Sequence, residues 1–147
     1  MARPEPRELD VIGKRKVTPN MLRVTLGGAG LAGFPEDQTS AYIKLRLPDA
    51  ASGRDVVRTY TVRTHHAETI DVDFALHEEC GPATSWAMNA KAGDTVMVGG
   101  PGPRKLVHDN ADWYLLVGDM TALPAISGNL ELLPETARGT AVIEVVD

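Results

Sequence analysis

The chain has 147 residues, of which 43% are hydrophobic and 24% charged, and its net charge is −5. This length and composition suit one globular unit with a real core. The single cysteine, Cys80, excludes an intramolecular disulfide, an iron–sulfur cluster held by four thiolates and a cysteine-rich zinc site. We therefore expect no resident metal, and we expect any electron transfer to use an organic cofactor.

Hydropathy and charge limit where we expect the protein to be located and which partners we expect it to bind. The longest apolar run, residues 113–117, is far too short to span a membrane, and the N-terminus lacks the apolar core of a signal peptide. Residues 1–108 hold 14 Lys/Arg against 13 Asp/Glu, whereas residues 109–147 hold 1 against 7. Neither part has the basic surface that nucleic acids require. We expect a cytoplasmic protein that binds neither nucleic acid nor membrane.

The chain before residue 109 is patterned as short strands separated by Gly, Pro and Asp. Apolar residues alternate with polar ones, which predicts half-buried strands. A helix is predicted over residues 82–90, and such a pattern is typical of an antiparallel β-barrel. The expected inward positions are Leu22, Val24, Leu26, Ile43, Leu45, Leu47, Ile70, Val72, Phe74, Leu76, Val96 and Val98.

The pattern changes after residue 108. The continuous apolar run over residues 113–117 is followed by a predicted helix and by a second apolar strand over residues 140–146. This order predicts one β-α-β unit with a parallel pair of strands. The helix is expected to place its apolar residues on one side, namely Leu123, Ile126, Leu130 and Leu133. The expected fold is therefore mainly β: an antiparallel barrel with one helix, followed by a β-α-β unit.

Two short motifs together predict a flavin site. Arg58 and Tyr60 lie two residues apart in a strand-like run over residues 57–63, so alternation places them on one face. A guanidinium beside an aromatic ring suits a pyrophosphate joined to a planar ring system. Further along, Gly81 permits an unusual turn and Pro82 favours a helix start, whose free amides attract phosphate. Either motif alone is also typical of an ordinary strand or helix start.

Six stretches extend this pattern over nearly the whole chain: residues 17–25, 58–63, 73–77, 81–87, 92–94 with 99–102, and 118–125. In this order they resemble the siderophore-interacting protein family, which comprises flavin-dependent ferric-siderophore reductases. The resemblance implies a flavin-binding β-barrel domain over residues 1–108 and the start of an NAD(P)H-binding α/β domain over residues 109–147. It implies FAD as cofactor, NADH or NADPH as electron donor and a ferric siderophore as substrate. The choice between FAD and FMN, the choice of nicotinamide and the identity of the siderophore stay open.

The resemblance also implies roles for individual residues. Arg58 is expected at the flavin pyrophosphate, Tyr60 against the ring, and Thr61 at the reactive edge, which makes Tyr60 and Thr61 the catalytic candidates. The other flavin-binding candidates are His77, Gly81, Ala83 and Thr84, whose hydroxyl is expected to add a donor. The NAD(P)H candidates are Gly118, Asp119 and Thr121, with Thr121 as helix N-cap. Lys44, Arg46, Arg104 and Lys105 are candidates for a positive rim that attracts an anionic siderophore.

Plainer interpretations remain for several of these residues. His77 can equally be a hydrogen-bonding structural histidine, and surface lysines and arginines are ordinarily solvated. The loop after residue 117 lacks the Gly-x-Gly-x-x-Gly fingerprint, so a simple turn between strand and helix stays open. His65 and His66 are interpreted as a polar hairpin tip and not as a ligand pair, because adjacent residues on extended chain point apart.

The family is expected to continue beyond residue 147. Two parallel strands with one helix cannot cover both faces of their sheet, so we expect a fragment, a truncated product or a chain completed by association, for example as a homodimer. Bound flavin is then expected to be reduced by dithionite, and slowly or not at all by NADH or NADPH. A non-catalytic flavin-binding module and a flavin reductase with another electron acceptor remain alternatives.

Overall fold

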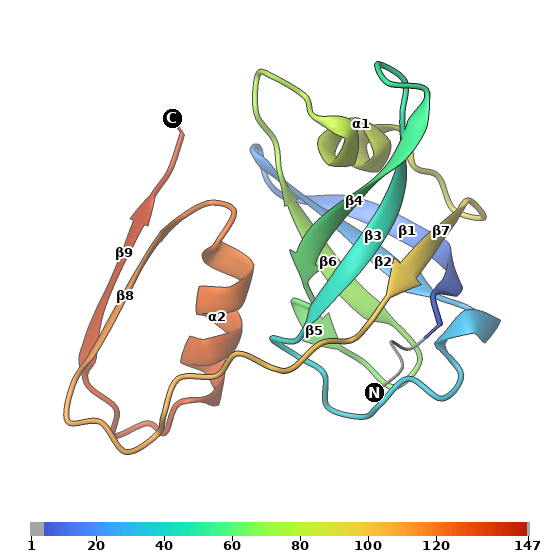
Figure 1. The fold of residues 1–147 in the computed structure, drawn as a ribbon. Helices are drawn as coiled ribbons and strands as arrows, with labels where there is room; N and C mark the ends of the chain where they lie inside the picture. The colour runs from blue at the N-terminus through green and yellow to red at the C-terminus, as the bar shows by residue number, and fades with distance from the viewer. Residues whose placement is uncertain (1–4, 147) are drawn as a thin grey trace.

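The computed structural model of the protein describes residues 5–146, and β-strands dominate it (Figure 1). Within these residues one antiparallel sheet has seven strands in the order β4-β3-β7-β1-β2-β6-β5. The strands are β1 (Arg7–Thr18), β2 (Met21–Gly27), β3 (Tyr42–Asp49), β4 (Arg54–Thr61), β5 (Thr64–His65), β6 (Ile70–Ala75) and β7 (Thr95–Gly99). A helix, α1 (Pro82–Asn89), lies between β6 and β7 in the chain. The expected mainly-β fold is confirmed.

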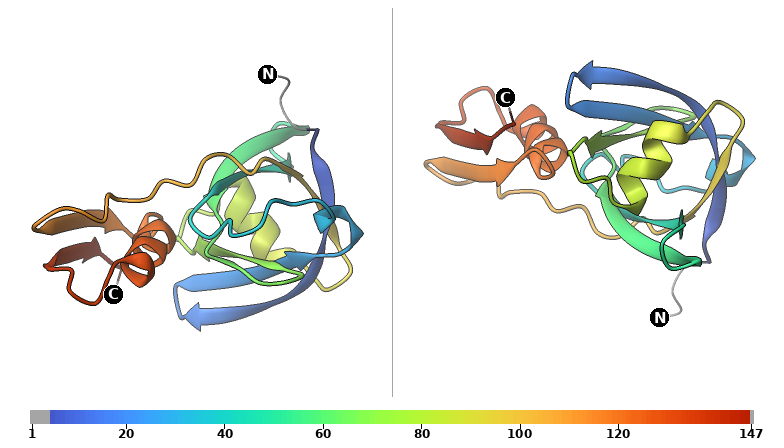
Figure 2. Two further views of the ribbon diagram at one scale, coloured as in Figure 1. Left: turned by 90° about the horizontal axis from the view of Figure 1, so that it is seen from below. Right: turned by 90° about the horizontal axis from the view of Figure 1, so that it is seen from above.

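The sheet curls into a barrel because its two edge strands, β4 and β5, are consecutive in the chain. Between them the backbone bonds to both sides of the sheet: the Val62 amide donates to the Ala41 carbonyl (2.8 Å) and the Arg63 amide to the Asp71 carbonyl (2.8 Å). Beyond this crossover, β4 and β6 face each other across a seam without being neighbours in the hydrogen-bonded order. The helix α1 caps the end of the barrel opposite β5 (Figure 2).

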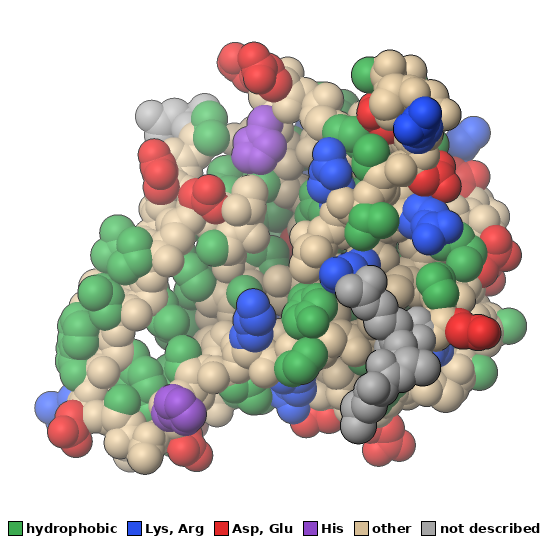
Figure 3. Space-filling view, in the orientation of Figure 1, with side chains coloured by type: hydrophobic (Ala, Val, Ile, Leu, Met, Phe, Trp, Pro, Cys, Tyr) green, Lys and Arg blue, Asp and Glu red, His purple; other side chains and the backbone are tan. Residues whose placement is uncertain are grey.

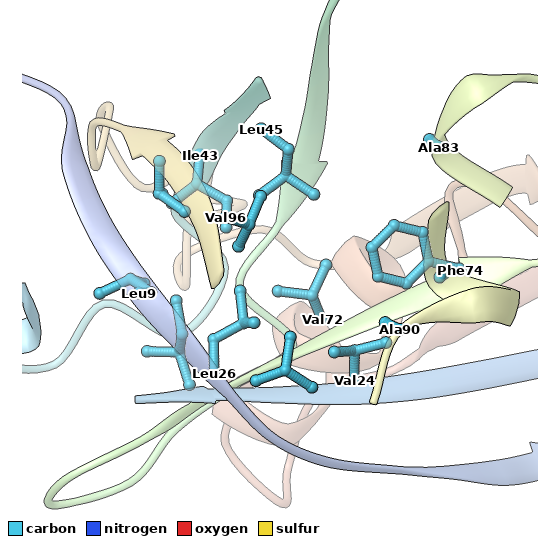
Figure 4. Close-up of a cluster of buried hydrophobic side chains, with 14 of the residues drawn as sticks. Leu9, Val24, Leu26, Ile43, Leu45, Val72, Phe74, Ala83, Ala90 and Val96 are labelled. Carbon is cyan, nitrogen blue, oxygen red and sulfur yellow. The ribbon is translucent and has the colours of Figure 1, made fainter. Parts of the chain in front are cut away.

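Strand alternation fills the barrel with apolar side chains, as predicted (Figure 4). Inward residues of β1, β2, β3, β6 and β7 are buried, those of β4 are partly buried, and Ala83, Ala87 and Ala90 let α1 approach the cluster closely. The predicted helix over residues 82–90 is confirmed to within one residue. Leu76 differs from its expectation, since it lies beyond the end of β6 and is only partly buried. The C-terminal end of α1 is held by Lys14 of β1, whose ammonium donates to the carbonyls of Ala87 and Met88.

The predicted β-α-β unit is also confirmed. It consists of β8 (Tyr114–Asp119), α2 (Leu123–Leu132) and β9 (Gly139–Glu144), with β8 and β9 parallel. The helix crosses β8 closely at Gly118, where an added Cβ would lie 2.6 Å from the Cβ of Ala122. Figures 1 and 2 show α2 between this small sheet and the barrel. No helix in residues 5–146 is long and apolar enough to cross a membrane.

The apolar residues of this unit are buried on one face only. Leu115, Val117 and Val142 lie on the sheet face that points away from α2 and are 52–64% exposed. Figure 3 shows their side of the molecule as a run of hydrophobic side chains over β8 and β9. The expected apolar side of the helix is only partly correct, because Ile126 is buried whereas Leu130 is exposed.

Three kinds of contact attach α2 to the barrel. Met120 and Leu123 pack on Met21 and Ala75 in a small second core. The Asn129 side chain fixes the linker before β8, since its amide donates to the Lys105 carbonyl (3.0 Å) and its oxygen accepts from the Val107 amide (2.8 Å). Near the C-terminal end of α2, Arg63 and Glu131 form a bidentate ion pair with N–O distances of 2.6 and 3.0 Å. The start of α2 is thereby held at the barrel seam.

Because of the Arg63–Glu131 pair, we expect the free energy of unfolding to depend slightly on pH. The hydrogen bond from Arg63 holds the pKa of Glu131 below its ordinary value. The pair therefore stabilises the fold above that ordinary value, and this stabilisation is lost as the pH falls through the lowered pKa. We expect Glu131→Gln to reduce the difference in unfolding free energy between about pH 7 and pH 3, by less than ~1 kcal/mol because the carboxylate is largely exposed.

The measurement is urea denaturation at both pH values, with Glu135→Gln as the matched control. Glu135 is exposed and forms no salt bridge in the part of the chain that the structure describes. An equal pH dependence for the parent and Glu131→Gln would contradict the assigned role of the pair.

Candidate functional site

A cavity of about 390 Å³ opens at the barrel seam. Its walls come from β4, β6, the start of α1 and the start of α2, so it lies where barrel, cap and β-α-β unit meet. We call it the seam pocket. Eight of the residues predicted from the sequence line it: Arg58, Tyr60, Thr61, His77, Gly81, Ala83, Thr84 and Thr121. Asp73, Ala75 and Pro124 also line it and were not proposed as site residues.

The Tyr60 ring packs against the aromatic residues of the core. Its ring lies 4.4 Å from that of Phe74, which in turn lies 5.9 Å from that of Trp86. Burial raises the pKa of the Tyr60 hydroxyl, an effect that the nearby Arg58 charge partly offsets, so the phenol is neutral at ordinary pH. The arrangement presents a rigid, uncharged ring to the pocket, which suits stacking against another planar group.

Arg58 presents an uncommitted guanidinium beside this ring. Among the described residues its one hydrogen bond runs from Nη1 to the adjacent Val57 carbonyl (3.0 Å), and no acidic side chain there pairs with it. The side chain is exposed on β4, as expected for the same strand face as Tyr60. A guanidinium with free donors can bind a phosphate group through two parallel hydrogen bonds.

The start of α1 supplies further donors but differs in two details from the sequence-based expectation. Gly81 is the N-cap with φ −73° and ψ 176°, ordinary extended backbone, so the expected unusual turn is wrong. The Thr84 hydroxyl is turned away as well, because it donates to the Ala75 carbonyl of β6 (3.4 Å). No side chain caps this helix start, and its first amides have no partner within the helix. Backbone amides, and not the threonine hydroxyl, are the donors available to an anion.

A second cavity of about 800 Å³ meets the seam pocket at Gly81 and Pro82. It lies between the β3–β4 hairpin and the outer side of α1, including Ser85, Trp86 and Asn89. Sequence reasoning missed this half of the site because it depends on how the hairpin folds over the helix. The two cavities form an elongated site with the helix start at its middle, which suits a ligand with a central anionic group.

The loop between β8 and α2 brings Thr121 to the seam pocket, whereas the other two NAD(P)H candidates, Gly118 and Asp119, do not line it. Asp119 accepts hydrogen bonds from the Thr121 hydroxyl and from the amides of Thr121 (2.8 Å) and Ala122 (3.3 Å). The hydroxyl bond, together with the amide bonds, lowers the pKa of Asp119. Ala122 is the N-cap of α2, so the expectation of Thr121 as N-cap is wrong. Gly118 lies against α2.

The basic candidates separate into two groups. Lys44 and Arg46 line a cavity of about 580 Å³ on the outer face of β3, adjacent to Thr59 and Val57 of β4. Arg104 does not join them, because its guanidinium binds Asp37 (2.6 Å) and the Thr39 carbonyl.

The two adjacent histidines have structural partners. His65 accepts a hydrogen bond from the Gln38 amide (3.1 Å), and His66 lies 2.9 Å from Asp71. No group of three metal-ligating side chains occurs within residues 5–146.

Comparisons with known proteins identify the family of the chain. A family model described as "Siderophore-interacting FAD-binding domain" matches residues 10–56 and 50–105, and one described as "Siderophore-interacting protein" matches residues 111–147. The chain belongs to the siderophore-interacting protein family. It is 40% identical to the ferric vibriobactin reductase ViuB of Vibrio cholerae, over 97% of this chain and 59% of the relative.

Solved structures of the siderophore-interacting protein family share the fold. The siderophore-interacting protein SipS from Aeromonas hydrophila superposes with a TM-score of 0.85 at 38% identity, covering 96% of this chain and 59% of SipS. A siderophore utilization protein from T. fusca gives a TM-score of 0.83 at 36% identity, over 97% of this chain and 62% of that protein. The chain thus spans less than two thirds of the length of these relatives.

Gly81 provides a test of the helix-start geometry. Because its backbone is extended and an added Cβ would meet nothing within 4 Å, we expect Gly81→Val to leave the unfolding free energy unchanged within about 0.5 kcal/mol. The same side chain would project where the two cavities meet, so we expect it to weaken FAD binding roughly tenfold.

The measurements are urea denaturation and fluorescence titration with FAD. Gly53→Val is the contrasting variant, because Gly53 has φ +68° and should lose stability. Unchanged FAD affinity in folded Gly81→Val would show that no ligand passes the helix start.

Proposed function

We propose that this chain is the flavin-binding part of an oxidoreductase that passes electrons from NADH or NADPH through FAD to a ferric siderophore. The proposal is carried by the seam pocket, which brings an uncommitted guanidinium and an aromatic ring of β4 together with the open start of α1. The name of the relative ViuB, a ferric vibriobactin reductase, supports the choice of acceptor. In this proposal residues 1–108 bind the flavin and residues 109–147 contribute to an NAD(P)H-binding domain.

The residues fit an FAD molecule along the elongated site. Arg58 and the first amides of α1 would hold the pyrophosphate, since both are donors without an anionic partner in the described chain. Tyr60 would cover one face of the flavin ring, and Thr61 would offer a hydroxyl near its reactive edge. The larger cavity beside Trp86 and Asn89 would take the adenosine half. His77 and Ala83 complete the wall around the ring and the phosphates.

Electron counting explains why a flavin suits this reaction. When bound, it accepts a hydride from a nicotinamide and delivers electrons one at a time to Fe(III). Hard oxygen chelators hold Fe(II) less well than Fe(III), so reduction releases the iron without destroying the chelator. In this proposal the chain's own residues would bind and orient the ring, and the nicotinamide would approach from the side of the loop of Gly118, Asp119 and Thr121, of which Thr121 lines the pocket.

An anionic siderophore would be attracted by the outer face of β3. Lys44 and Arg46 line a cavity there, and the Lys105 ammonium lies 5.8 Å from the centre of the Tyr42 ring in the same region. Lys44 pairs with Thr59 in the β3–β4 ladder, next to the strand segment that lines the seam pocket. Arg104 is omitted from this rim, because Asp37 neutralises it.

Arg58 and Tyr60 are the residues on which flavin binding should depend most. We expect Arg58→Ala to weaken FAD binding by about one to two decades, as the loss of a charge-assisted contact costs roughly 1.5–3 kcal/mol. Tyr60→Ala should weaken it similarly and shift the flavin absorption spectrum. Arg15→Ala removes an exposed arginine of β1 that lies outside the pocket and serves as the charge-matched control.

Affinity is measured by titration with FAD, and folding by circular dichroism. Parent-like FAD affinity in folded Arg58→Ala and Tyr60→Ala would overturn the site assignment.

The complete reaction is tested without oxygen. The flavin-loaded chain is reduced with dithionite in one series and with NADH or NADPH in another, and is then mixed with a ferric siderophore and an Fe(II)-specific chelator. We expect dithionite-reduced flavin to be reoxidised with release of two Fe(II) per flavin, because the ring holds two electrons. Reduced flavin that persists in the presence of the ferric complex would contradict ferric-siderophore reduction and leave flavin binding intact.

A further inference from the structure

The wall of the seam pocket contains a buried ion pair that the proposed electron path does not use. Asp73 lies on β6 and is only 7% exposed, although its side chain points out of the barrel core. Both of its carboxylate oxygens bind the Arg23 guanidinium of β2, at 2.7 Å to Nε and 2.8 Å to Nη2. The two residues face each other in the β2–β6 ladder, so the backbone register fixes the pair.

This pair forms a partition between two cavities. Asp73 lines the seam pocket together with Thr61 and Ala75. Asp73 and Arg23 both line a neighbouring cavity of about 590 Å³, whose other walls include Met120 and Leu123. The charges therefore lie beside the edge of the pocket at which the flavin ring is placed, with the guanidinium behind the carboxylate.

The pair has little contact with solvent, since the Arg23 and Asp73 side chains are 14% and 6% exposed. Met21, Ala75 and Met120, each at least nine-tenths buried, form a small apolar cluster in the same region. Charges that are shielded from water act over longer distances than exposed ones. Arg23 is charged at ordinary pH, because the hydrogen bond to Asp73 raises its pKa further. Two other acidic groups nearby are already engaged, since Asp71 binds Thr25 and His66, and Glu131 binds Arg63.

We propose that the Arg23–Asp73 pair keeps the net charge beside the flavin ring of the seam pocket near zero, so that neither charge alone shifts the reduction potential of the flavin. This inference rests on the proposed function. Reduction adds electrons to the ring, so an unbalanced negative charge beside it disfavours the reduced form and an unbalanced positive charge favours it. The intact pair contributes little net charge, and removing either member exposes the other.

The two single substitutions should therefore shift the potential in opposite directions. Asp73→Asn leaves the Arg23 charge unbalanced and should raise the potential; Arg23→Gln leaves the Asp73 charge unbalanced and should lower it. We expect each to change the equilibrium ratio of reduced to oxidised flavin about tenfold, which is ~30 mV for a two-electron couple. The double variant carries no charge at either position and should return close to the parent value. A purely structural role would not produce opposite signs.

The potential is measured by anaerobic dithionite titration of the FAD-loaded chain against a reference dye, with absorption spectra to confirm that flavin is bound. Arg23→Lys keeps the positive charge and should retain the parent potential. Glu131→Gln removes a charge from the ion pair that does not line the seam pocket, and should shift the potential much less than Asp73→Asn does. If Arg23→Gln does not fold, Asp73→Asn and the double variant decide the question.

The outcomes separate this inference from the proposed function. Bound flavin with an unchanged potential in Asp73→Asn, or single variants that shift the potential in the same direction, would overturn the inference alone. Failure of the parent chain to bind FAD would overturn the proposed function and the inference together.

Discussion

The crossover at Val62 and Arg63 is the constraint on which the rest of the structure depends. Two consecutive amides bond to opposite sides of one sheet, that of Val62 to Ala41 just before β3 and that of Arg63 to Asp71 of β6, so the barrel is closed at this end by backbone alone. Two strands that meet at a point and carry their own twist separate beyond it, which opens a seam between β4 and β6. The aromatic contact of Tyr60 with Phe74 bridges the seam, and α1 covers its wider end. The pocket is a geometric product of this closure.

Arg58 of the pocket differs from several other arginines of the chain in having no acidic partner among the described residues. The donors of Arg58 and of the α1 start are left without anionic partners in the described chain, whereas Arg23, Arg63 and Arg104 are each paired with an acid. The unpaired cation lies at the open end, where a ligand can neutralise it. The paired arginines each link two segments that are far apart in the sequence.

Sequence patterning predicted most of the barrel because burial imposes a period of two on a strand. Val24, Ile43 and Phe74 were placed in the core on that ground, and Pro82 located the start of α1 to the residue. The same reasoning could not tell which face of β8 is covered, since a continuous apolar run has no period; the structure covers the face of Leu116 and leaves that of Leu115 exposed.

Local details of the candidate site were less predictable, because side-chain partners are set by tertiary contacts. Nothing in the sequence shows that Asp119, and not Thr121, organises the turn before α2, or that the Thr84 hydroxyl is taken by a β6 carbonyl. The alternation of β6 did place Asp73 outside the core, but only the register with Arg23 reveals its partner. The residues assigned to the flavin from the family resemblance remain a prediction, although the fold brings most of them to one cavity.

Arg63 connects the wall of the seam pocket to α2 through its ion pair with Glu131. Thr61 and Arg63 are two residues apart on extended chain, roughly 7 Å. The end of β4 that lines the pocket is therefore followed directly by the residue that binds Glu131 of α2. Asn129 clamps the linker, which removes the obvious place for a hinge. A movement of α2 relative to the barrel must therefore pull on β4, and hydrogen exchange at the Val62 amide would report it. The position of α2 and the shape of the pocket wall at Thr61 are therefore coupled.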